Sequence, residues 1–195
     1  YLTALYQLAK AAVEKEDYAE AKELLLRAVG EYPHNLGEGK LESGQENNLY
    51  YLLGLVQEKL GEAKDAFESL TRACCGESEP VGMMYYNDQP PEMIYYQGLA
   101  YRMLGEEEQA VRRFQKLVDY GREHIRDDVK IDYFAVSLPD LLIFEENLNE
   151  RNRKHCLFMM SLGLKGLGRI DEAEKCAEEL LAMDNAHQEI RVHDL

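Results

Sequence analysis

The sequence predicts an all-α protein built from repeated pairs of short helices. The first observation is the stretch 94–117, where apolar and small residues recur at helical spacing on both sides of a break at Leu104 and Gly105. The second is that the small residues of this stretch return at matching positions in three other parts of the chain. A single helix pair cannot bury its own apolar face, so we expect neighbouring pairs to stack and share one core.

The break in residues 94–117 has the chemistry of a tight turn between two helices. Gly105 follows the last apolar residue of the first helix, and a glycine there can adopt the left-handed conformation that caps a helix. The acidic residues Glu106, Glu107 and Glu108 come next and favour the positive end of the following helix dipole. We therefore expect two short helices joined at Gly105.

The same frame begins at the N-terminus of the chain. If a unit starts at Leu2, its eighth, twentieth and twenty-seventh positions are all alanine, and a proline follows near its end: Ala9, Ala21, Ala28 and Pro33. Small residues at these positions allow two helices to cross closely. The first unit is therefore predicted at residues 2–35.

Three more units fit the frame, at residues 47–80, 91–124 and 154–187. The small residues at their matching positions are Gly54, Gly61, Ala66 and Ala73 in the second, Gly98, Gly105 and Ala110 in the third, and Ser161, Gly168, Ala173 and Ala177 in the fourth. Helix packing explains all of these residues, so we assign them no ligand role. A large side chain in place of Gly54, Gly98 or Ala110 is expected to cost about 1–3 kcal/mol through overpacking.

This frame resembles the tetratricopeptide (TPR) repeat, a helix-turn-helix unit of about 34 residues. The resemblance covers about 136 of the 195 residues. It implies a TPR-type α-solenoid, a right-handed superhelix of helix pairs, with four repeats in a single domain over residues 1–195. The chain departs from the family pattern because insertions at residues 36–46, 81–90 and 125–153 separate the repeats.

The insertion 125–153 is predicted to add one extra helix to the four repeats. Ser137 can cap a helix with Pro139 in its first turn, which places that helix near residues 138–148. Apolar side chains gather in this segment: Tyr133, Phe134, Leu138, Leu141, Leu142 and Phe144. They either fold back onto the solenoid or form an interface with another domain or subunit.

Three longer strings carry a second resemblance. They are NLGEGKL at 35–41, MYYNDQPPEMIYYQGLA at 84–100, and DYFAVSLPDLLIFEENLNERNRKHCLFMMSLGLKGLG at 132–168. They are similar to the C-terminal TPR region of a family of large bacterial proteins whose preceding domains resemble carbohydrate-active β-sandwich modules. This resemblance implies a sugar-related context, and it implies no catalytic motif for these residues.

Composition excludes several classes of partner. The chain has 22 Lys and Arg against 37 Asp and Glu, a net charge of -15, and no basic cluster that could neutralise nucleic-acid phosphates or an anionic membrane. No apolar run approaches the roughly 18 residues that span a bilayer. We expect neither nucleic acid nor membrane as a partner, and a cytoplasmic location. The start at Tyr1 suggests a domain excised from a longer protein or a processed chain.

The cysteines and histidines do not form a predicted reactive or metal site. The four cysteines, Cys74, Cys75, Cys156 and Cys176, lack the paired spacing of zinc ligands, so we expect free thiols packed as small hydrophobic side chains. His155 and Cys156 are adjacent, and side chains of adjacent helical residues point about 100° apart and cannot exchange a proton directly. We predict no catalytic residue, no metal and no cofactor.

Aromatic residues recur on the predicted groove side of the solenoid. The fifth position of the four repeats holds Tyr6, Tyr51, Tyr95 and Phe158, flanked by Lys10, Asn48, Arg102 and His155. Such a row could stack on sugar rings or hold apolar side chains of a peptide. The alternative is that some of the rings pack against a neighbouring helix or are covered by the long insertion.

The leading functional hypothesis is a non-catalytic protein-protein interaction or assembly module within a larger bacterial protein. Its partner would be a protein or peptide, another domain of the same chain, or a second copy of the chain. The alternative hypothesis is a carbohydrate-associated accessory domain that supports a glycan-active site elsewhere in the full protein. An enzyme made by this segment alone is the weakest hypothesis.

Overall fold

The computed structural model describes residues 1–30, 45–82, 88–130 and 147–193. These ranges form nine α-helices, which confirms the predicted all-α class. They divide into two compact units: residues 1–77 with 96–110, and residues 78–95 with 111–195. The candidate interface residues from Tyr133 to Phe144 and nearly all of the predicted extra helix lie outside the described residues.

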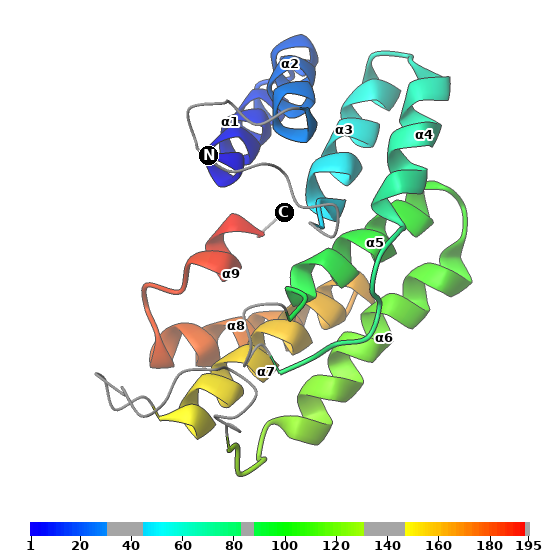
Figure 1. Ribbon diagram of the computed structural model, residues 1–195. Helices are drawn as coiled ribbons and strands as arrows, with labels where there is room; N and C mark the ends of the chain where they lie inside the picture. Colours follow the sequence, from blue (N-terminus) through cyan, green and yellow to red (C-terminus); the bar gives the residue numbers. More distant parts are fainter. Residues whose placement is uncertain (31–44, 83–87, 131–146, 194–195) are drawn as a thin grey trace, which may run out of the picture. The chain divides into compact units, whose positions relative to one another are not determined.

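The first unit contains two antiparallel helix pairs. Helix α1 (Leu2–Glu14) packs on α2 (Tyr18–Val29), α2 packs on α3 (Asn47–Lys59), and α3 packs on α4 (Ala63–Ala73) (Figure 1). At the start of α2, the Asp17 carboxylate accepts a hydrogen bond from the Glu20 backbone N–H at 3.1 Å. Each pair lies within one of the ranges expected to hold a repeat.

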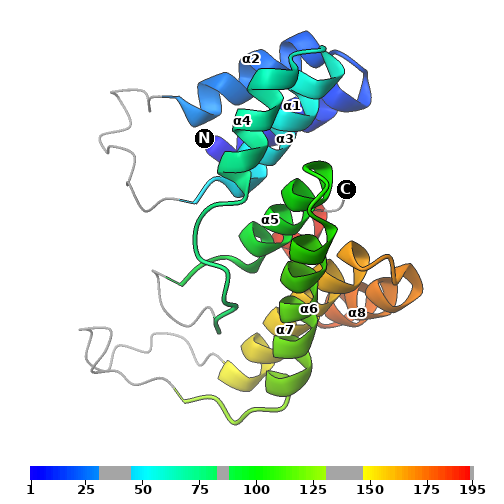
Figure 2. The same cartoon turned by 90° about the vertical axis from the view of Figure 1, so that its right-hand side faces the viewer.

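The second unit is built around a long central helix. Helix α7 (Leu148–Gly166) packs on α8 (Ile170–Met183), and a short helix, α9 (Gln188–Val192), follows (Figures 1 and 2). Helices α5 (Pro91–Met103) and α6 (Glu107–His124) contribute residues to both units. The start of α7 precedes the expected start of the fourth repeat at Lys154, and its N-cap is Asn147. The repeat pattern of the sequence does not indicate α9, which follows the predicted fourth repeat.

Left-handed glycines close three of the helix pairs. Gly105 has a φ of 81°, which confirms the predicted cap, and Gly61 and Gly168 have φ values of 78° and 75°. In the first pair Glu16, which holds the matching place, has a φ of 60°. A side chain in this region places its Cβ close to the following carbonyl oxygen, at a cost of roughly 1–2 kcal/mol. The first turn is therefore the strained one.

Replacing Glu16 with glycine is expected to raise the free energy of unfolding by about 1 kcal/mol, because glycine has no Cβ to strain at this φ. Urea unfolding followed by circular dichroism measures the change. Glu16→Ala is the matched control, since it removes the carboxylate but keeps the Cβ. Equal gains for the two variants would contradict the strain argument.

Small residues let helices approach closely in both units. In the first unit, a Cβ added at Gly54 would lie 2.6 Å from Leu70 Cγ, so α3 and α4 meet at this glycine. In the second unit, a Cβ at Gly163 would lie 2.6 Å from the backbone oxygen of Phe114, and one at Gly121 would lie 2.8 Å from that of Cys156. Helices α6 and α7 therefore cross with their backbones almost in contact.

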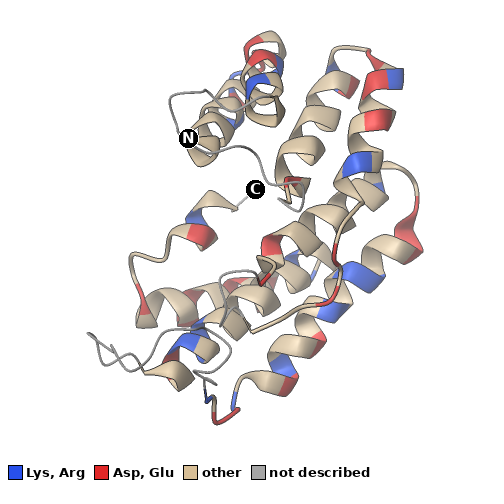
Figure 3. Cartoon of the chain, viewed as in Figure 1, with Lys and Arg blue, Asp and Glu red and all other residues tan. Residues whose placement is uncertain are grey.

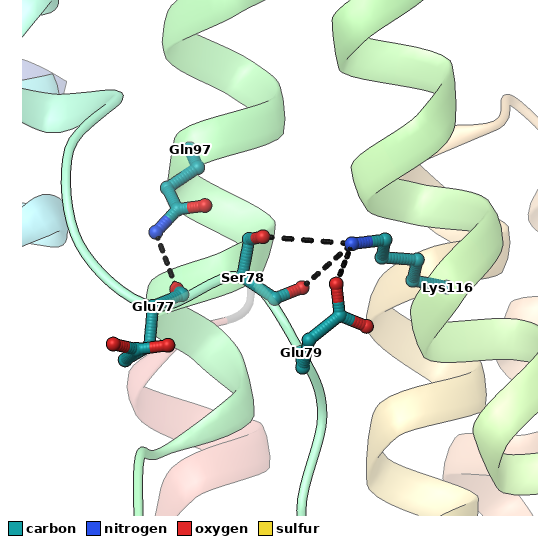
Figure 4. A network of polar contacts seen from close by, with 5 residues as sticks. All are labelled: Glu77, Ser78, Glu79, Gln97 and Lys116. Carbon is teal, nitrogen blue, oxygen red and sulfur yellow. Dashed lines mark hydrogen bonds and ion pairs between the residues drawn. The ribbon is translucent and has the colours of Figure 1, made fainter.

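Polar side chains anchor the segment that follows α4. In the first unit, Gln97 on α5 donates from Nε2 to the carbonyl oxygen of Glu77 at 2.8 Å. In the second unit, Lys116 on α6 donates from Nζ to the carbonyl oxygen of Ser78 at 3.4 Å and pairs with Glu79. Figure 4 shows these contacts. Gln97 is fully buried. The carbonyl of Glu77 therefore gives the Gln97 side-chain amide a hydrogen-bond partner in place of water.

The helix surfaces carry charges of both signs. Lys and Arg lie among Asp and Glu along α6 (Figure 3). Exposed pairs such as Arg169 with Glu172, at 2.6 Å, contribute little to stability because water screens them. No helix in the described ranges is long and apolar enough to cross a membrane.

Candidate functional site

The second unit contains a pocket of about 390 Å³, which we call the C-terminal pocket. One part of its wall comes from the start of α5 and the segment before it, and a second part comes from α7. The third part comes from the residues that follow α8. The lining residues are Gly82, Pro90, Pro91, Glu92, Arg151, Lys154, His155, Phe158, Asp184, His187 and Glu189.

Helical spacing explains why α7 presents several of these side chains together. Lys154 and His155 lie three and four residues after Arg151, and Phe158 lies four and three residues after them, so the four side chains follow one face of the helix. The first turn of α5 contributes Glu92. The combination of charged groups around an aromatic ring is typical of a site that orients a ligand by polar contacts and buries part of it on apolar surface.

Burial shifts the protonation of two groups in the pocket wall. Glu92 is only 8% exposed, and its burial raises the pKa of its carboxyl from 4.5 to about 7, helped by the nearby negative charge of Glu189. Burial also lowers the pKa of His155. The Nε2–H of His155 donates to the carbonyl oxygen of Val81 at 2.8 Å, which fixes the ring. His155 is therefore a neutral, oriented imidazole at pH 7.

The residues after α8 touch the pocket wall at three places. Lys154 Nζ lies 3.7 Å from Asp184 Oδ2. The ring of His187 lies 5.5 Å from that of Phe158, measured between centroids. His193 Nε2 lies 3.8 Å from Glu92 Oε1. The last residues of the described chain thus contact both helices that form the rest of the wall.

Two of the eight groove residues named from the sequence line this pocket: His155 and Phe158. The pocket residues from the start of α5 and from the end of the chain were not named as candidates. Glu92 holds the same repeat position as His155, the second, so that spacing could have identified it. For Asp184, His187 and Glu189 there was no such signal, because Asp184 and His187 lie in the last four positions of the predicted fourth repeat and Glu189 follows it.

Two other members of the aromatic row lie in an internal cluster of the first unit. The Tyr6 and Tyr96 hydroxyl oxygens are 2.6 Å apart and hydrogen-bonded, and the Tyr51 ring centroid lies 5.6 Å from that of Tyr96. Tyr6 is 1% exposed and Tyr96 fully buried, while Tyr51 is partly exposed. Lys10 Nζ lies over the Tyr6 ring, 5.9 Å from its centroid. Tyr96 belongs to this cluster, but it lies one residue beyond the predicted Tyr95 and was not named from the sequence.

The remaining groove candidates are Tyr95, Arg102 and Asn48. Tyr95 is buried, with its ring 5.7 Å from that of Phe114 in the second unit. Arg102 is exposed and pairs with Glu107 at 2.7 Å, and this contact holds the pKa of the Glu107 carboxyl below its usual value. Asn48 is partly exposed on α3. A binding role for these residues stays a prediction.

The cysteines are free thiols in different environments. Cys156 is fully buried, and its burial raises the pKa of its thiol to about 12. The thiol faces Asn152 Oδ1 at 3.7 Å, away from any proton exchange with His155. Cys75 is exposed, so the prediction that the thiols are packed is wrong for this residue. Within the described ranges, no group of three His, Cys, Asp or Glu residues is arranged to hold a metal ion.

A thiol reagent at neutral pH is expected to modify Cys75 rapidly and Cys156 only after the second unit unfolds. The thiolate is the reactive form, and burial disfavours it at Cys156. Mass spectrometry of peptides after timed labelling measures both rates, and Cys75→Ser should remove the fast reaction. Rapid labelling of Cys156 in the folded protein would contradict its burial.

Comparisons with known proteins find tetratricopeptide repeats in the chain and similar solved structures, among them two of MamA. Two family models described as tetratricopeptide repeat match residues 6–80 and 92–120, together more than half of the chain. A crystal structure of MamA is 19% identical, covers 97% of this chain and 81% of that chain, and gives a TM-score of 0.34. A second crystal structure of MamA protein is also 19% identical, covers 100% and 78%, and gives a TM-score of 0.33.

Proposed function

The chain belongs to the tetratricopeptide-repeat family, and from this premise we propose that it is a non-catalytic module that binds a peptide segment of a partner protein in the C-terminal pocket. Repeats of this kind generally serve as protein-binding scaffolds, because stacked helix pairs create extended concave surfaces. The observation that carries the proposal is the joining of Lys154, His155 and Phe158 with Glu92 in one pocket.

The pocket has the size and chemistry for peptide side chains. Its volume of about 390 Å³ is at the lower end of the range for ligand sites, which is about 300–1,000 Å³. Phe158 offers an apolar surface, Lys154 and Arg151 offer cationic donors, and Glu92 offers a carboxyl that gains or loses a proton near neutral pH. The backbone and side chains of a peptide supply partners for the apolar surface, for the cationic donors and for the carboxyl.

Selection of a random dodecapeptide library displayed on phage, using the immobilised full chain, tests this function. We expect recurrent peptides whose affinity falls at least five-fold in Lys154→Ala, because that change removes a cation from the pocket wall. The matched control is Lys175→Ala, which removes an exposed lysine from α8 and should leave the affinity unchanged. Failure to enrich any peptide, or equal losses in the two variants, would overturn the proposal.

The partner segment could belong to a separate protein, to another domain of the same chain, or to a second copy. Sedimentation of the chain tests the last of these. A monomer at high micromolar concentration would exclude self-association as the means of supplying the peptide. A concentration-dependent dimer that dissociates in Lys154→Ala would support it.

The carbohydrate-associated function is the second proposal, supported by the sequence resemblance to the C-terminal region of large bacterial proteins with carbohydrate-active-like domains. Stacking on a sugar requires an exposed ring face. Of the four aromatic residues in the predicted row, Tyr51 alone is partly exposed, while Tyr6, Tyr95 and Phe158 are buried. The four rings therefore do not form an exposed row on which a sugar chain could stack. The peptide-binding proposal is the stronger of the two because it also uses the charged groups that line one pocket.

A further inference from the structure

The residues from Asp184 to His193, here called the C-terminal segment, occupy part of the C-terminal pocket. Each contact joins a residue of this segment to a residue of α5 or α7, the first helices of the third and fourth predicted repeats. Asp184 meets Lys154 and His187 meets Phe158, both on α7, while His193 meets Glu92 on α5. The segment therefore runs along the surface that the first helices of a TPR array use for ligands.

Charge distinguishes the segment from the wall on which it lies. The residues of α5 and α7 that line the pocket include the permanent cations Arg151 and Lys154 and the carboxyl of Glu92. Glu150, which also lies on α7, has its Oε1 3.8 Å from Lys154 Nζ. The lining residues of α5 and α7 are more basic than the chain as a whole, which has a net charge of -15. The C-terminal segment brings Asp184 and Glu189 to it. Electrostatic complementarity of this kind favours an acidic occupant.

The contact of the segment with Lys154 is weak enough to be exchanged, whereas the contact of His193 with Glu92 is buried, with side chains 7% and 10% exposed. The side chains of Lys154 and Asp184 are 27% and 33% exposed, and a partly exposed ion pair of this length is only weakly stabilising. Helix α9 has five residues, none of them buried. A helix that short is not stable by itself and depends on what it touches. The segment is thus held by a few separate side chains.

We propose that the C-terminal segment is an internal stand-in for the partner, and that the partner is a peptide that displaces it. Such a peptide places a carboxylate beside Lys154 and a planar ring against Phe158, as Asp184 and His187 now do. The inference rests on the proposed function, because it names the class of peptide that the C-terminal pocket takes. It adds that the C-terminal segment and the peptide compete for the pocket.

Two substitutions can weaken the segment without removing its local hydrogen bonds. In Asp184→Asn the amide oxygen can still accept the Ala186 N–H, a bond of 3.1 Å in the native chain. In His187→Asn the side chain can still cap α9, as the imidazole now does by accepting the Ile190 N–H. Both variants lose the contact with α7. If the double variant does not fold, His187→Asn alone serves in its place.

The probe is a fluorescently labelled synthetic peptide with the sequence of residues 183–193. We expect the Asp184→Asn and His187→Asn double variant to bind it about ten-fold more tightly than the wild type, because the internal competitor is weakened. Glu178→Gln, which removes an exposed carboxylate from α8, should bind like the wild type. A peptide with asparagine at positions 184 and 187 should bind weakly to both the wild type and the double variant.

The outcomes separate this inference from the proposed function. Equal affinities of the wild type and the double variant for the probe would overturn the inference. If library-selected peptides still bind in that case and depend on Lys154, the proposed function stands. If neither the probe nor any selected peptide binds either protein, both proposals are wrong.

Discussion

Replacing Gly163 with alanine is expected to lower the free energy of unfolding of the second unit by about 3 kcal/mol. The added Cβ would lie 2.6 Å from the backbone oxygen of Phe114 and 2.8 Å from Val118 Cγ2. A backbone atom cannot move aside as a flexible side chain can, so α6 and α7 must separate. The separation loses contacts along the whole crossing, where interiors are close-packed.

The sign of this result discriminates packing from helix propensity. Alanine is a better helix former than glycine by about 1 kcal/mol, so an open site would give a more stable protein. Arg153→Ala, at an exposed position of the same helix, is the control, and we expect a change within about 0.5 kcal/mol. Urea unfolding measures both. A stable Gly163→Ala variant would show that α6 and α7 do not cross at this glycine.

Replacing Glu92 with glutamine is expected to stabilise the second unit by up to about 3 kcal/mol at pH 8 and to have little effect at pH 5. Burial raises the pKa of the Glu92 carboxyl from 4.5 to about 7, and each pKa unit corresponds to about 1.4 kcal/mol. The folded chain therefore binds this proton more tightly than the unfolded chain. The stabilisation is present at low pH and is lost as the pH rises through 7.

Other titratable groups lie near Glu92 and set the controls for this test. His193 is 3.8 Å away, Glu189 adds negative charge from α9, and Lys154, His155 and His187 line the same pocket. Glu178→Gln, on the exposed side of α8, should show no such difference between the two pH values. If Glu92→Gln instead destabilises the chain at pH 8, the carboxylate is held as a charged pair with His193 and the expected sign is wrong.

The fold class could be predicted from the sequence because its signals are local. Small residues at helix crossings and a glycine at each turn, such as Gly105, depend only on spacing within one helix pair. The strained turn at Glu16 was not foreseen. The repeat frame places a turn there, but the first repeat has Glu16 where the other three have glycine. The close approach at Gly163 was also missed, because its cause lies on α6 and not in the repeat pattern.

The candidate site could be predicted only in part. His155 and Phe158 were identified because groove positions recur with the repeat. Whether an aromatic residue at such a position is exposed depends on tertiary packing, and burial of Tyr95 against Phe114 was not readable from spacing. The rest of the pocket comes from the start of α5 and the segment before it, from α7, and from the residues that follow α8. Among these residues only Glu92 holds a repeat position that recurs in the groove.

The central claim is that the C-terminal pocket binds peptides, and amide hydrogen exchange of the full chain with and without the residue 183–193 peptide tests it most directly. The account predicts slower exchange in residues 151–158, where the peptide covers α7, and faster exchange in residues 188–192, where the chain's own segment is released. Unchanged exchange at both places, with protection confined to residues 2–77, would contradict it.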